Sequence, residues 1–240
     1  MHGLNRTLIR HTILPYININ NKLIRTFIYN NKLIFNDKIM ERKIKRKNSN
    51  KAVAIIASQK KHWSLGLLDS MKDPTLKVIE DDSIVVIKDK YPKAKFHYLV
   101  LPKENISTIW KITKSHENLL RHMDDVAEEL TKKHPEHEFL IGYHSMPSMQ
   151  RMHLHVISTD FNSPCLKTKQ HWNSFTTPFF MHSKELCKQL KENGVLKKIS
   201  FTTSKQYLNS ELKCHRCPIK PKNMPELKKH LILHVSGKKE

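Results

Sequence analysis

The chain has 240 residues, enough for one ordinary domain and a small module, and its 43 Lys and Arg against 22 Asp and Glu give a formal net charge of +21. This charge indicates a polyanionic partner, nucleic acid before a membrane, because contacts to phosphates release counterions. No apolar run reaches about eighteen residues, the length that a membrane-spanning helix needs, so we expect no membrane partner.

Residues 1–50 differ in composition from the rest of the chain. Through residue 36 they contain no acidic residue, and they are rich in Ile and Asn. This composition predicts either a disordered leader or a mitochondrial transit peptide, although Pro15 and the Asn content disfavour the amphipathic helix of such a peptide. The basic run at 42–47, just after a second candidate start at Met40, indicates a nuclear localisation signal or a DNA-contacting arm. We therefore expect a nuclear protein, with a mitochondrial form as the alternative.

From residue 51 the pattern becomes that of a folded domain. A helix containing Trp63 and Leu67 is predicted to end at Asp73-Pro74, and a long amphipathic helix is predicted between Ser107 and Lys133. Another short helix is predicted around residues 183–192, ending near Gly194. Predicted strands cover residues 78–79, 84–87, 96–101, 139–143 and 152–157. Hairpins combined with one long helix predict an α+β domain with an antiparallel sheet.

A metal-binding motif lies near the C-terminus. Cys214, Cys217, His230 and His234 have the spacing Cys-x2-Cys-x12-His-x3-His, which is that of a two-Cys, two-His zinc finger. We predict that these four residues bind a structural Zn²⁺ in a small ββα-like module. A single finger contacts too few bases to specify a sequence, so its expected role is to grip nucleic acid or to recognise an end.

The features around this motif support the same prediction. Asn223 is expected to cap the finger helix, and Leu227 is expected to supply its small apolar core. The two remaining cysteines, Cys165 and Cys187, are expected to be free thiols, which indicates a reducing compartment.

The candidate active site is the stretch from Arg151 to Ile157. On a strand, the period of two would send Arg151, His153 and His155 to one face. A neutral imidazole can attack phosphorus when a hydrogen bond fixes its other nitrogen. His155, Ser148 and backbone amides near Met149 could then hold the phosphate oxygens, and Arg151 would add a permanent positive charge.

Two other interpretations of these histidines remain. With His144, the residues His153 and His155 could hold a catalytic metal ion. Alternatively, the histidines could be structural members of a packed strand.

The stretch resembles the signature of the histidine-triad hydrolases, a strand of the form His-Φ-His-Φ-His-Φ-Φ with Φ apolar, except that Arg151 occupies the first position. The resemblance extends from about residue 60 to 235 and is closest to the DNA 5′-adenylate hydrolases of this superfamily, which carry a C-terminal zinc finger. It rests on strings that include His62-Trp63-Ser64, residues 86–94, Leu99-Val100-Leu101-Pro102, Gly142-Tyr143-His144, Pro147-Ser148-Met149, residues 153–158 and residues 171–175.

The resemblance implies an activity and a set of site residues. It implies that AMP is removed from 5′-adenylated DNA left by abortive ligation, through an AMP-histidine intermediate on His153 and without a metal in the chemical step. The implied catalytic residues are His153, His155, Ser148, His144 and Arg151. The implied nucleotide contacts are Leu67, Asp89 and Met149, and the implied DNA contacts are Trp63, Lys93, Lys103, Asn162, Ser163 and Lys167.

We divide the chain into a leader at 1–50, a histidine-triad domain at 51–180, and a helix with the zinc-finger module at 181–240. Some members of the family carry a forkhead-associated domain that binds phosphorylated partners. Residues 1–50 are too short and too biased for that fold, so we do not expect this kind of recruitment. Two rival functions are a small-molecule nucleotide phosphoramidate hydrolase and a non-catalytic DNA-end-binding protein, in which Arg151 would mark a decayed triad.

Overall fold

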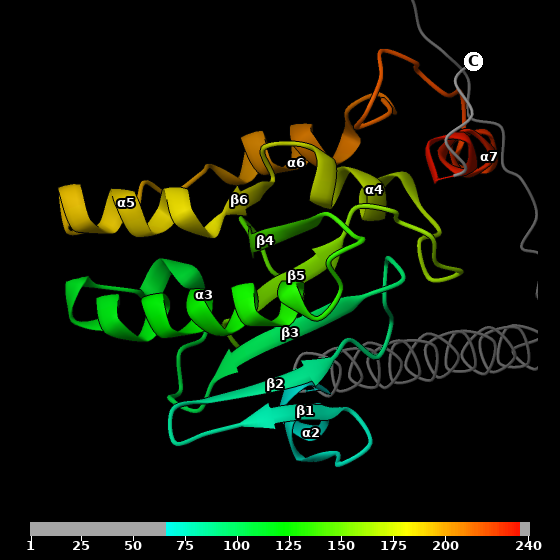
Figure 1. Cartoon of the computed structure of the whole chain (residues 1–240). Helices are drawn as coiled ribbons and strands as arrows, with labels where there is room; N and C mark the ends of the chain where they lie inside the picture. The colour runs from blue at the N-terminus through cyan, green and yellow to red at the C-terminus, as the bar shows by residue number, and fades with distance from the viewer. Residues whose placement is uncertain (1–65, 236–240) are drawn as a thin grey trace, which may run out of the picture. The chain divides into compact units, whose positions relative to one another are not determined.

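The computed structural model describes residues 66–235, and all of them lie within one compact unit, residues 59–240. The predicted leader, the basic run at 42–47 and Trp63 fall outside the described residues. Figure 1 shows a twisted antiparallel sheet of six strands with helices on both of its faces. The strand order is β1-β2-β3-β5-β4-β6, so the strand that follows the candidate nucleophile, β5, lies inside the sheet and not at its edge.

The strands are β1 (Lys77–Glu80), β2 (Ile84–Lys88), β3 (His97–Pro102), β4 (Phe139–His144), β5 (Leu154–Ser158) and β6 (Phe180–His182). The helices are α2 (Gly66–Lys72), α3 (Glu117–Lys132), α4 (Lys169–Thr176), α5 (Ser183–Asn193), α6 (Phe201–Asn209) and α7 (Met224–Val235), with the short 3-10 turns η1 (Ile109–Lys111) and η2 (Lys114–His116) before α3.

The predicted α+β class and antiparallel sheet are confirmed, and every predicted strand forms with shifts of one or two residues at its ends. The sequence analysis missed β6, α4 and α6, all of which follow the sheet's central strands in the chain. The sequence does contain a signal for α4, because Thr168 is a residue type that favours the position before a helix. In the structure its hydroxyl caps α4 by accepting a hydrogen bond from the His171 amide at 3.1 Å. Trp172 and Phe175 then follow at helical spacing.

One face of the sheet is covered by α3 and α5. The main core there contains Ile84, Val86, Val100, Leu154 and Val156 from the strands, Leu120, Met123, Ala127 and Leu130 from α3, and Leu186 and Leu190 from α5. The predicted boundary at residue 180 therefore separates parts that pack together, because β6 pairs with β4 and α5 packs into the main core. α5 ends as predicted at Gly194, which adopts a left-handed φ of 72°.

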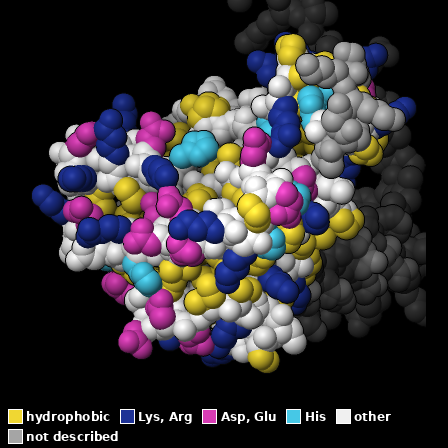
Figure 2. All heavy atoms as spheres, in the orientation of Figure 1, with side chains coloured by type: hydrophobic (Ala, Val, Ile, Leu, Met, Phe, Trp, Pro, Cys, Tyr) yellow, Lys and Arg dark blue, Asp and Glu magenta, His cyan; other side chains and the backbone are white. Residues whose placement is uncertain are grey.

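The outer surface of this layer carries charge of both signs. Figure 2 shows Lys and acidic side chains intermixed over α3 and α5. Lys184 pairs with Glu128 at 2.8 Å and Lys132 pairs with Glu129 at 2.5 Å. The excess of positive charge is therefore not concentrated over these two helices.

The other face of the sheet carries the histidines. In the ladders, His155 lies opposite Leu99 of β3 and Gly142 of β4, so these residues share one face, and alternation adds His97 and His144. Next to the histidines, an apolar cluster under α2 contains Leu67, Val85, Ile87, Leu99 and Leu101. On the β4 and β6 side, a second cluster contains Ile157, Phe161, Leu166, Trp172, Phe175 and Phe180.

The second cluster continues into the C-terminal module. Leu212, Cys214, Leu227 and Leu231 belong to it, so the finger packs against the sheet domain. Between α6 and α7 the described chain forms turns without a strand, so the predicted ββα-like hairpin is replaced by a turn followed by a helix. The predicted cap is confirmed, because Asn223 Oδ1 accepts from the Glu226 amide at 2.9 Å. None of the helices within residues 66–235 has both the length and the apolar content that crossing a membrane requires.

Candidate active site and zinc module

His153 lies one residue before β5, and a backbone carbonyl holds its ring. Its Nδ1 lies 2.8 Å from the carbonyl oxygen of Arg151. Because a carbonyl oxygen only accepts, neutral His153 carries its proton on Nδ1 and has a lone pair on Nε2. Burial lowers the pKa of His153, which favours this neutral form. The ring is therefore oriented and in the tautomer that a nucleophile needs.

A chain of hydrogen bonds fixes the tautomer of His155 as well. The backbone amide of Lys93, which can only donate, lies 3.2 Å from Nδ1 of His97. Burial lowers the pKa of His97 to about 4, so this ring is neutral and must carry its proton on Nε2. That Nε2 lies 3.0 Å from Nδ1 of His155 and donates to it. Nε2 of His155 is then an N–H donor, and it is buried with no hydrogen-bond partner among residues 66–235.

His144 completes the group, and aromatic rings enclose it. Its ring centroid lies 4.3 Å from that of His155 and 4.8 Å from that of Phe175. Within the described residues its Nε2 is also buried without a hydrogen-bond partner. Burial, followed by the charges of neighbouring histidines, holds the pKa values of His144 and His155 well below their usual range. The site thus collects neutral imidazoles in a desolvated pocket.

Gly142 makes this arrangement sterically possible. A Cβ at this position would lie 2.3 Å from the carbonyl oxygen of Met181 and 2.7 Å from the ring of Phe180. Phe180 is one of the rings near His144 and His155, with centroid distances of 6.0 and 6.4 Å. The absence of a side chain therefore lets β6 pair closely with β4 and bring Phe180 to the histidines.

The structure corrects the expectation for Arg151. This residue precedes β5 and its guanidinium turns to the loop after β3, where it donates to the carbonyls of Pro102 (3.0 Å) and Lys103 (2.5 Å) and to Asn105 Oδ1 (2.9 Å). These contacts, and not a shared strand face with His153 and His155, determine its position. Only 8% of Arg151 is exposed. Its side chain is thus a structural anchor.

The backbone of Arg151 has a function that sequence reasoning missed. Its φ of 140° is a positive value that non-glycine residues rarely adopt. Its amide donates to the Ser107 carbonyl at 3.2 Å, and the next amide donates to the Ile106 carbonyl at 2.8 Å. With the side-chain anchors, these bonds hold the strained turn whose carbonyl orients His153.

The expected nucleotide residues flank the histidines. Leu67 is buried in the apolar cluster under α2, and Met149 packs against the same cluster. Asp89 Oδ2 lies 3.5 Å from Nδ1 of His97, so a carboxylate that is distant in sequence lies beside the histidine chain. Ser148 is exposed on the loop between β4 and β5.

The expected DNA-contacting residues separate into two places. Burial is the main cause of the lowered pKa values of His97, His144, His155 and His171, and the charge of nearby Lys93 lowers each of them further. Near it, the hydroxyl of Ser163 donates to the Pro92 carbonyl at 2.5 Å, while Asn162 and Lys167 are exposed on the same connection.

Lys103 lies elsewhere. It directly follows β3, at the end of the strand away from His97, and its Nζ pairs with Glu80 at 3.0 Å. This pairing could not be predicted from local spacing, because Glu80 reaches Lys103 only through the antiparallel pairing of β1, β2 and β3. Trp63 lies outside the described residues.

The four predicted zinc ligands converge. Their donor atoms all lie within 4.8 Å of one another, with Cys214 Sγ 3.3 Å from His234 Nε2 and Cys217 Sγ 3.1 Å from His230 Nε2. Two thiol sulfurs and two imidazole nitrogens are the donor set of tetrahedral structural zinc, and the spacing of these atoms matches the edges of such a tetrahedron. The residues therefore fit Zn²⁺.

Contacts outside the ligand set join this module to the sheet domain. Arg216, between the two cysteines, donates to Glu138 Oε2 and to Thr159 Oγ1, both at 2.9 Å. Lys228 of α7 donates to the Ser163 carbonyl at 2.9 Å. Trp172 Nε1 donates to the Lys213 carbonyl at 2.9 Å. These links could not be found by motif matching, since neither Arg216 nor Lys228 belongs to the metal motif.

A second convergent set was not expected. Asp89, His97 and His155 also place donor atoms within 4.8 Å of one another. In the hydrogen-bonded arrangement described above, however, His97 Nε2 and His155 Nδ1 are bonded to each other. We therefore assign these three residues to the histidine chain.

Comparisons with known proteins agree with this architecture. Residues 62–171 match the family described as "Scavenger mRNA decapping enzyme C-term binding", and residues 176–237 match the "C2HE / C2H2 / C2HC zinc-binding finger". Among solved structures, the chain is similar to the "aprataxin ortholog Hnt3 in complex with DNA", with a TM-score of 0.59 and 22% identity over 74% of this chain and 95% of that one. This likeness supports the fold.

Sequence relatives are more similar. The chain is 48% identical over 191 residues to Aprataxin of Ciona intestinalis and 47% identical over 178 residues to Aprataxin of Danio rerio, matching 78% and 72% of this chain. It spans about half the length of these two relatives, 49% and 54%. It is also 30% identical to the Aprataxin-like protein of Saccharomyces cerevisiae, matching 65% of this chain and 86% of that protein. The chain therefore belongs to the aprataxin family.

Proposed function

We propose that this protein hydrolyses 5′-adenylated DNA ends, the products of abortive ligation, to AMP and a 5′-phosphate end. The observation that carries the proposal is the pairing of two differently prepared imidazoles, His153 with a lone pair on Nε2 and His155 with an N–H on Nε2. The first suits attack on phosphorus, and the second suits a phosphate oxygen. Relatives named Aprataxin and a structure titled "Hnt3 in complex with DNA and guanosine" support DNA and a nucleoside as the bound chemistry.

The reaction proceeds in two displacements. Nε2 of His153 attacks the adenylate phosphorus, a P–N bond forms, and the P–O bond to the DNA 5′-phosphate breaks. That leaving group is a stable anion, so strong general-acid help is not required. The modified ring becomes a cation, which the Arg151 carbonyl stabilises through Nδ1–H. Water then attacks phosphorus and the P–N bond breaks, releasing AMP and a proton and restoring neutral His153.

The other site residues stabilise the phosphate. The buried Nε2–H of His155 donates to a non-bridging oxygen, and desolvation makes that hydrogen bond strong. His144 contributes through its own buried Nε2, and Ser148 supplies a hydroxyl from the loop between β4 and β5. Lys93 adds positive potential to the pocket. No metal takes part in this chemical step, because an imidazole is the nucleophile and N–H groups are the oxyanion donors.

Nucleotide and DNA occupy opposite sides of the histidines. Leu67 and Met149 face the adenine, and Asp89 accepts from the ribose hydroxyls. Lys93, Asn162, Ser163 and Lys167 contact the DNA side, with Trp63 stacking on the terminal base. The zinc module contributes Lys residues and is held to this surface by Lys228 and Arg216. Lys103, already paired with Glu80, contributes little. Because the substrate is damaged DNA, we place the activity in the nucleus.

The test is turnover of nicked, 5′-adenylated DNA by the full chain. His153→Ala should reduce AMP release by about 10⁴-fold or more, because the covalent route is lost. His122→Asn, a partly exposed histidine on α3, is the matched control and should leave turnover unchanged. Acid-quenched wild-type protein should carry AMP label in the first turnover. Undiminished turnover by His153→Ala would refute the nucleophile, and faster cleavage of free adenylated nucleotides than of adenylated DNA would favour a small-molecule hydrolase.

A further inference from the structure

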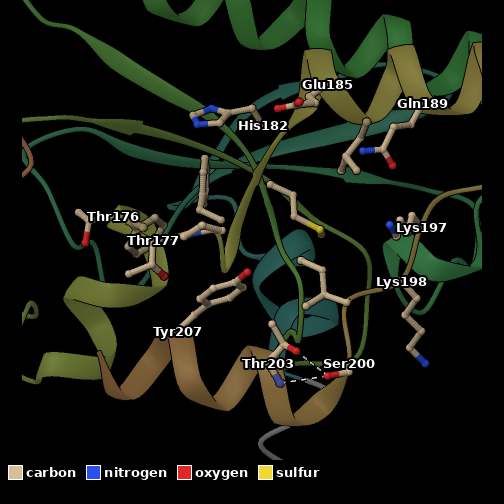
Figure 3. Close-up of a pocket in the computed structure, with 16 residues that line it drawn as sticks. Thr176, Thr177, His182, Glu185, Gln189, Lys197, Lys198, Ser200, Thr203 and Tyr207 are labelled. Atoms are coloured by element: carbon tan, nitrogen blue, oxygen red, sulfur yellow. Dashed lines mark hydrogen bonds between the residues drawn. The ribbon is translucent and has the colours of Figure 1, made fainter. Parts of the chain in front are cut away.

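A cavity of about 730 Å³ lies apart from the histidine site, between the start of α6, the segment before it, α5 and β6 (Figure 3). This volume is in the range of small-molecule binding sites. Of the four clustered histidines, none lines the cavity as the described residues form it. Two of its lining residues, Phe175 and Phe180, also contact the histidine rings, so the cavity lies directly behind the active site.

One side of the cavity has unused polar groups. Gln189 Oε1 is buried there, and within the described part of the chain it has no hydrogen-bond partner. Figure 3 shows Gln189 and Lys197 on the same side of the cavity. A buried acceptor without a partner costs free energy that a ligand donor would recover, and the ammonium group of Lys197 on the same side of the cavity favours an anion. This side therefore fits a ligand that offers both an O–H or N–H donor and a negative charge.

The remaining walls suit a flat apolar body. Tyr207 of α6 directs its hydroxyl toward the middle of the cavity (Figure 3), and Met181, Ile199 and Phe180 also line it. Aromatic and thioether side chains pack well against a planar ring, and a central phenol offers one further hydrogen bond. A purely apolar ligand would leave Gln189 Oε1 without a hydrogen bond. Inorganic phosphate alone would leave the apolar side chains of the cavity exposed to water.

We infer that this cavity binds a nucleotide of the nucleoside-monophosphate class. The phosphate pairs with Lys197, a sugar hydroxyl donates to Gln189 Oε1, and the base packs against Tyr207 and Met181. In a nucleotide the sugar, with its hydroxyl, lies between the phosphate and the base, so one ligand can reach all three contacts. The ligand is either a free nucleotide or the 3′-terminal nucleotide of a DNA strand, since both present a phosphate, a base and a free sugar hydroxyl.

Methionine methyl NMR on the full chain distinguishes this cavity from the histidine site. Met181 reports on the cavity, whereas Met149 and Met152 lie on the loop and turn before β5. AMP and a short 5′-phosphorylated oligodeoxynucleotide serve as separate probes, with inorganic phosphate as a third. The Met181 signal is assigned with Met181→Leu. AMP should shift the Met181 signal with its own dissociation constant, separate from that of Met149.

Variants then locate the contacts. Lys197→Ala and Tyr207→Ala should each raise the dissociation constant measured from the Met181 signal about tenfold, since each removes one of the main contacts. The dissociation constant measured from the Met149 signal should not change. Lys191→Ala, which removes an exposed lysine of α5 outside the cavity, is the charge-matched control and should have no effect. Lys197→Arg keeps the charge and should retain binding, which separates loss of the contact from loss of folding.

The probes also identify the source of the ligand. A Met181 response to AMP assigns a free nucleotide, and a response to the oligonucleotide alone assigns the 3′-terminal nucleotide of a strand; both support the inference. A Met181 signal that no probe moves would overturn it. An equal response in the wild type and in Lys197→Ala and Tyr207→Ala would overturn it as well, whatever happens to DNA hydrolysis.

Discussion

Nε2 of His97 lies 3.0 Å from Nδ1 of His155, and this contact joins two residues that are 58 positions apart in the chain. The contact determines the tautomer of His155. The Lys93 amide donates to Nδ1 of His97 and so places the His97 proton on Nε2, which then donates to Nδ1 of His155 and leaves the His155 proton on Nε2. The consequence is an N–H of His155 available to the substrate phosphate. His97 therefore acts as a positioning residue for His155.

Replacing His97 should disturb His155 before it disturbs the fold. In His97→Ala, the Nδ1 atom of His155 loses its donor, so the tautomer that places hydrogen on Nε2 is no longer enforced. We expect the single-turnover rate to fall about tenfold to a hundredfold, less than or comparable to removal of one oxyanion donor. Imidazole ¹⁵N spectra should show His155 as a mixture of tautomers. An unchanged ¹⁵N pattern together with an unchanged rate would exclude this role, and His97→Gln, whose amide can still donate, should recover part of the rate.

Arg151 should affect stability more directly than phosphate binding. Arg151→Ala removes donors to the Pro102 and Lys103 carbonyls and should lower the free energy of unfolding by about 2–4 kcal/mol. Arg151→Gly removes the same donors but relieves the positive φ, so it should be less destabilising than Arg151→Ala by about 1 kcal/mol. Urea unfolding measures both variants. If Arg151→Ala unfolds like the wild type but loses adenylate affinity, the side chain contacts the phosphate after all.

The buried histidines predict loss of stability in acid. The pKa values of His97, His144, His153 and His155 are all lowered in the folded protein, mainly by burial, so below the unfolded value of 6.5 the unfolded chain binds more protons. Their contribution is fully present above pH 6.5 and is lost as the pH falls toward the folded pKa, about 4 for His97.

The free energy of unfolding, measured by urea titration from pH 8 to about 4, should therefore be level at first and then decline by up to about 1.4 kcal/mol per pH unit for each histidine. His97→Gln should decline less steeply than the wild type over this interval. A midpoint that stays level down to pH 5 would contradict neutral burial of these rings. Turnover should fall on the same acidic side, since His153 must be neutral to attack.

Removing zinc should loosen the module without abolishing the chemistry. Cys214 belongs to the apolar cluster that includes Trp172 and Phe175, and Phe175 contacts His144 and His155. A chelator should lower the melting temperature and shift Trp172 fluorescence, measured in a Trp63→Phe, Trp110→Phe background. Hydrolysis of adenylated DNA should weaken and should return fully with added Zn²⁺. Activity on a free adenylated nucleotide should persist throughout. Complete loss on both substrates would mean that the metal has a direct part in catalysis.

The sequence by itself determined the parts of this protein that depend on local spacing. Alternation of apolar residues predicted the strands, and the helical stripe at Met123, Ala127 and Leu130 predicted α3, because a period of two or of 3.6 follows from backbone geometry. The Cys and His spacing predicted a zinc set whose atoms do converge. The histidines before and in β5 identified the candidate active site for the same reason.

Only the tertiary structure decided what depends on contacts across strands and loops. Arg151 lies beside His153 in the chain, yet its guanidinium bonds to the loop after β3 because a positive φ redirects the chain there. His97 and Asp89 reach His155 through antiparallel pairing, which no local spacing encodes. The same holds for α5, which continues into the main core, and for Arg216, which fastens the zinc module to Glu138. Side-chain partners far apart in sequence are chosen by packing, and that choice is made only when the whole sheet forms.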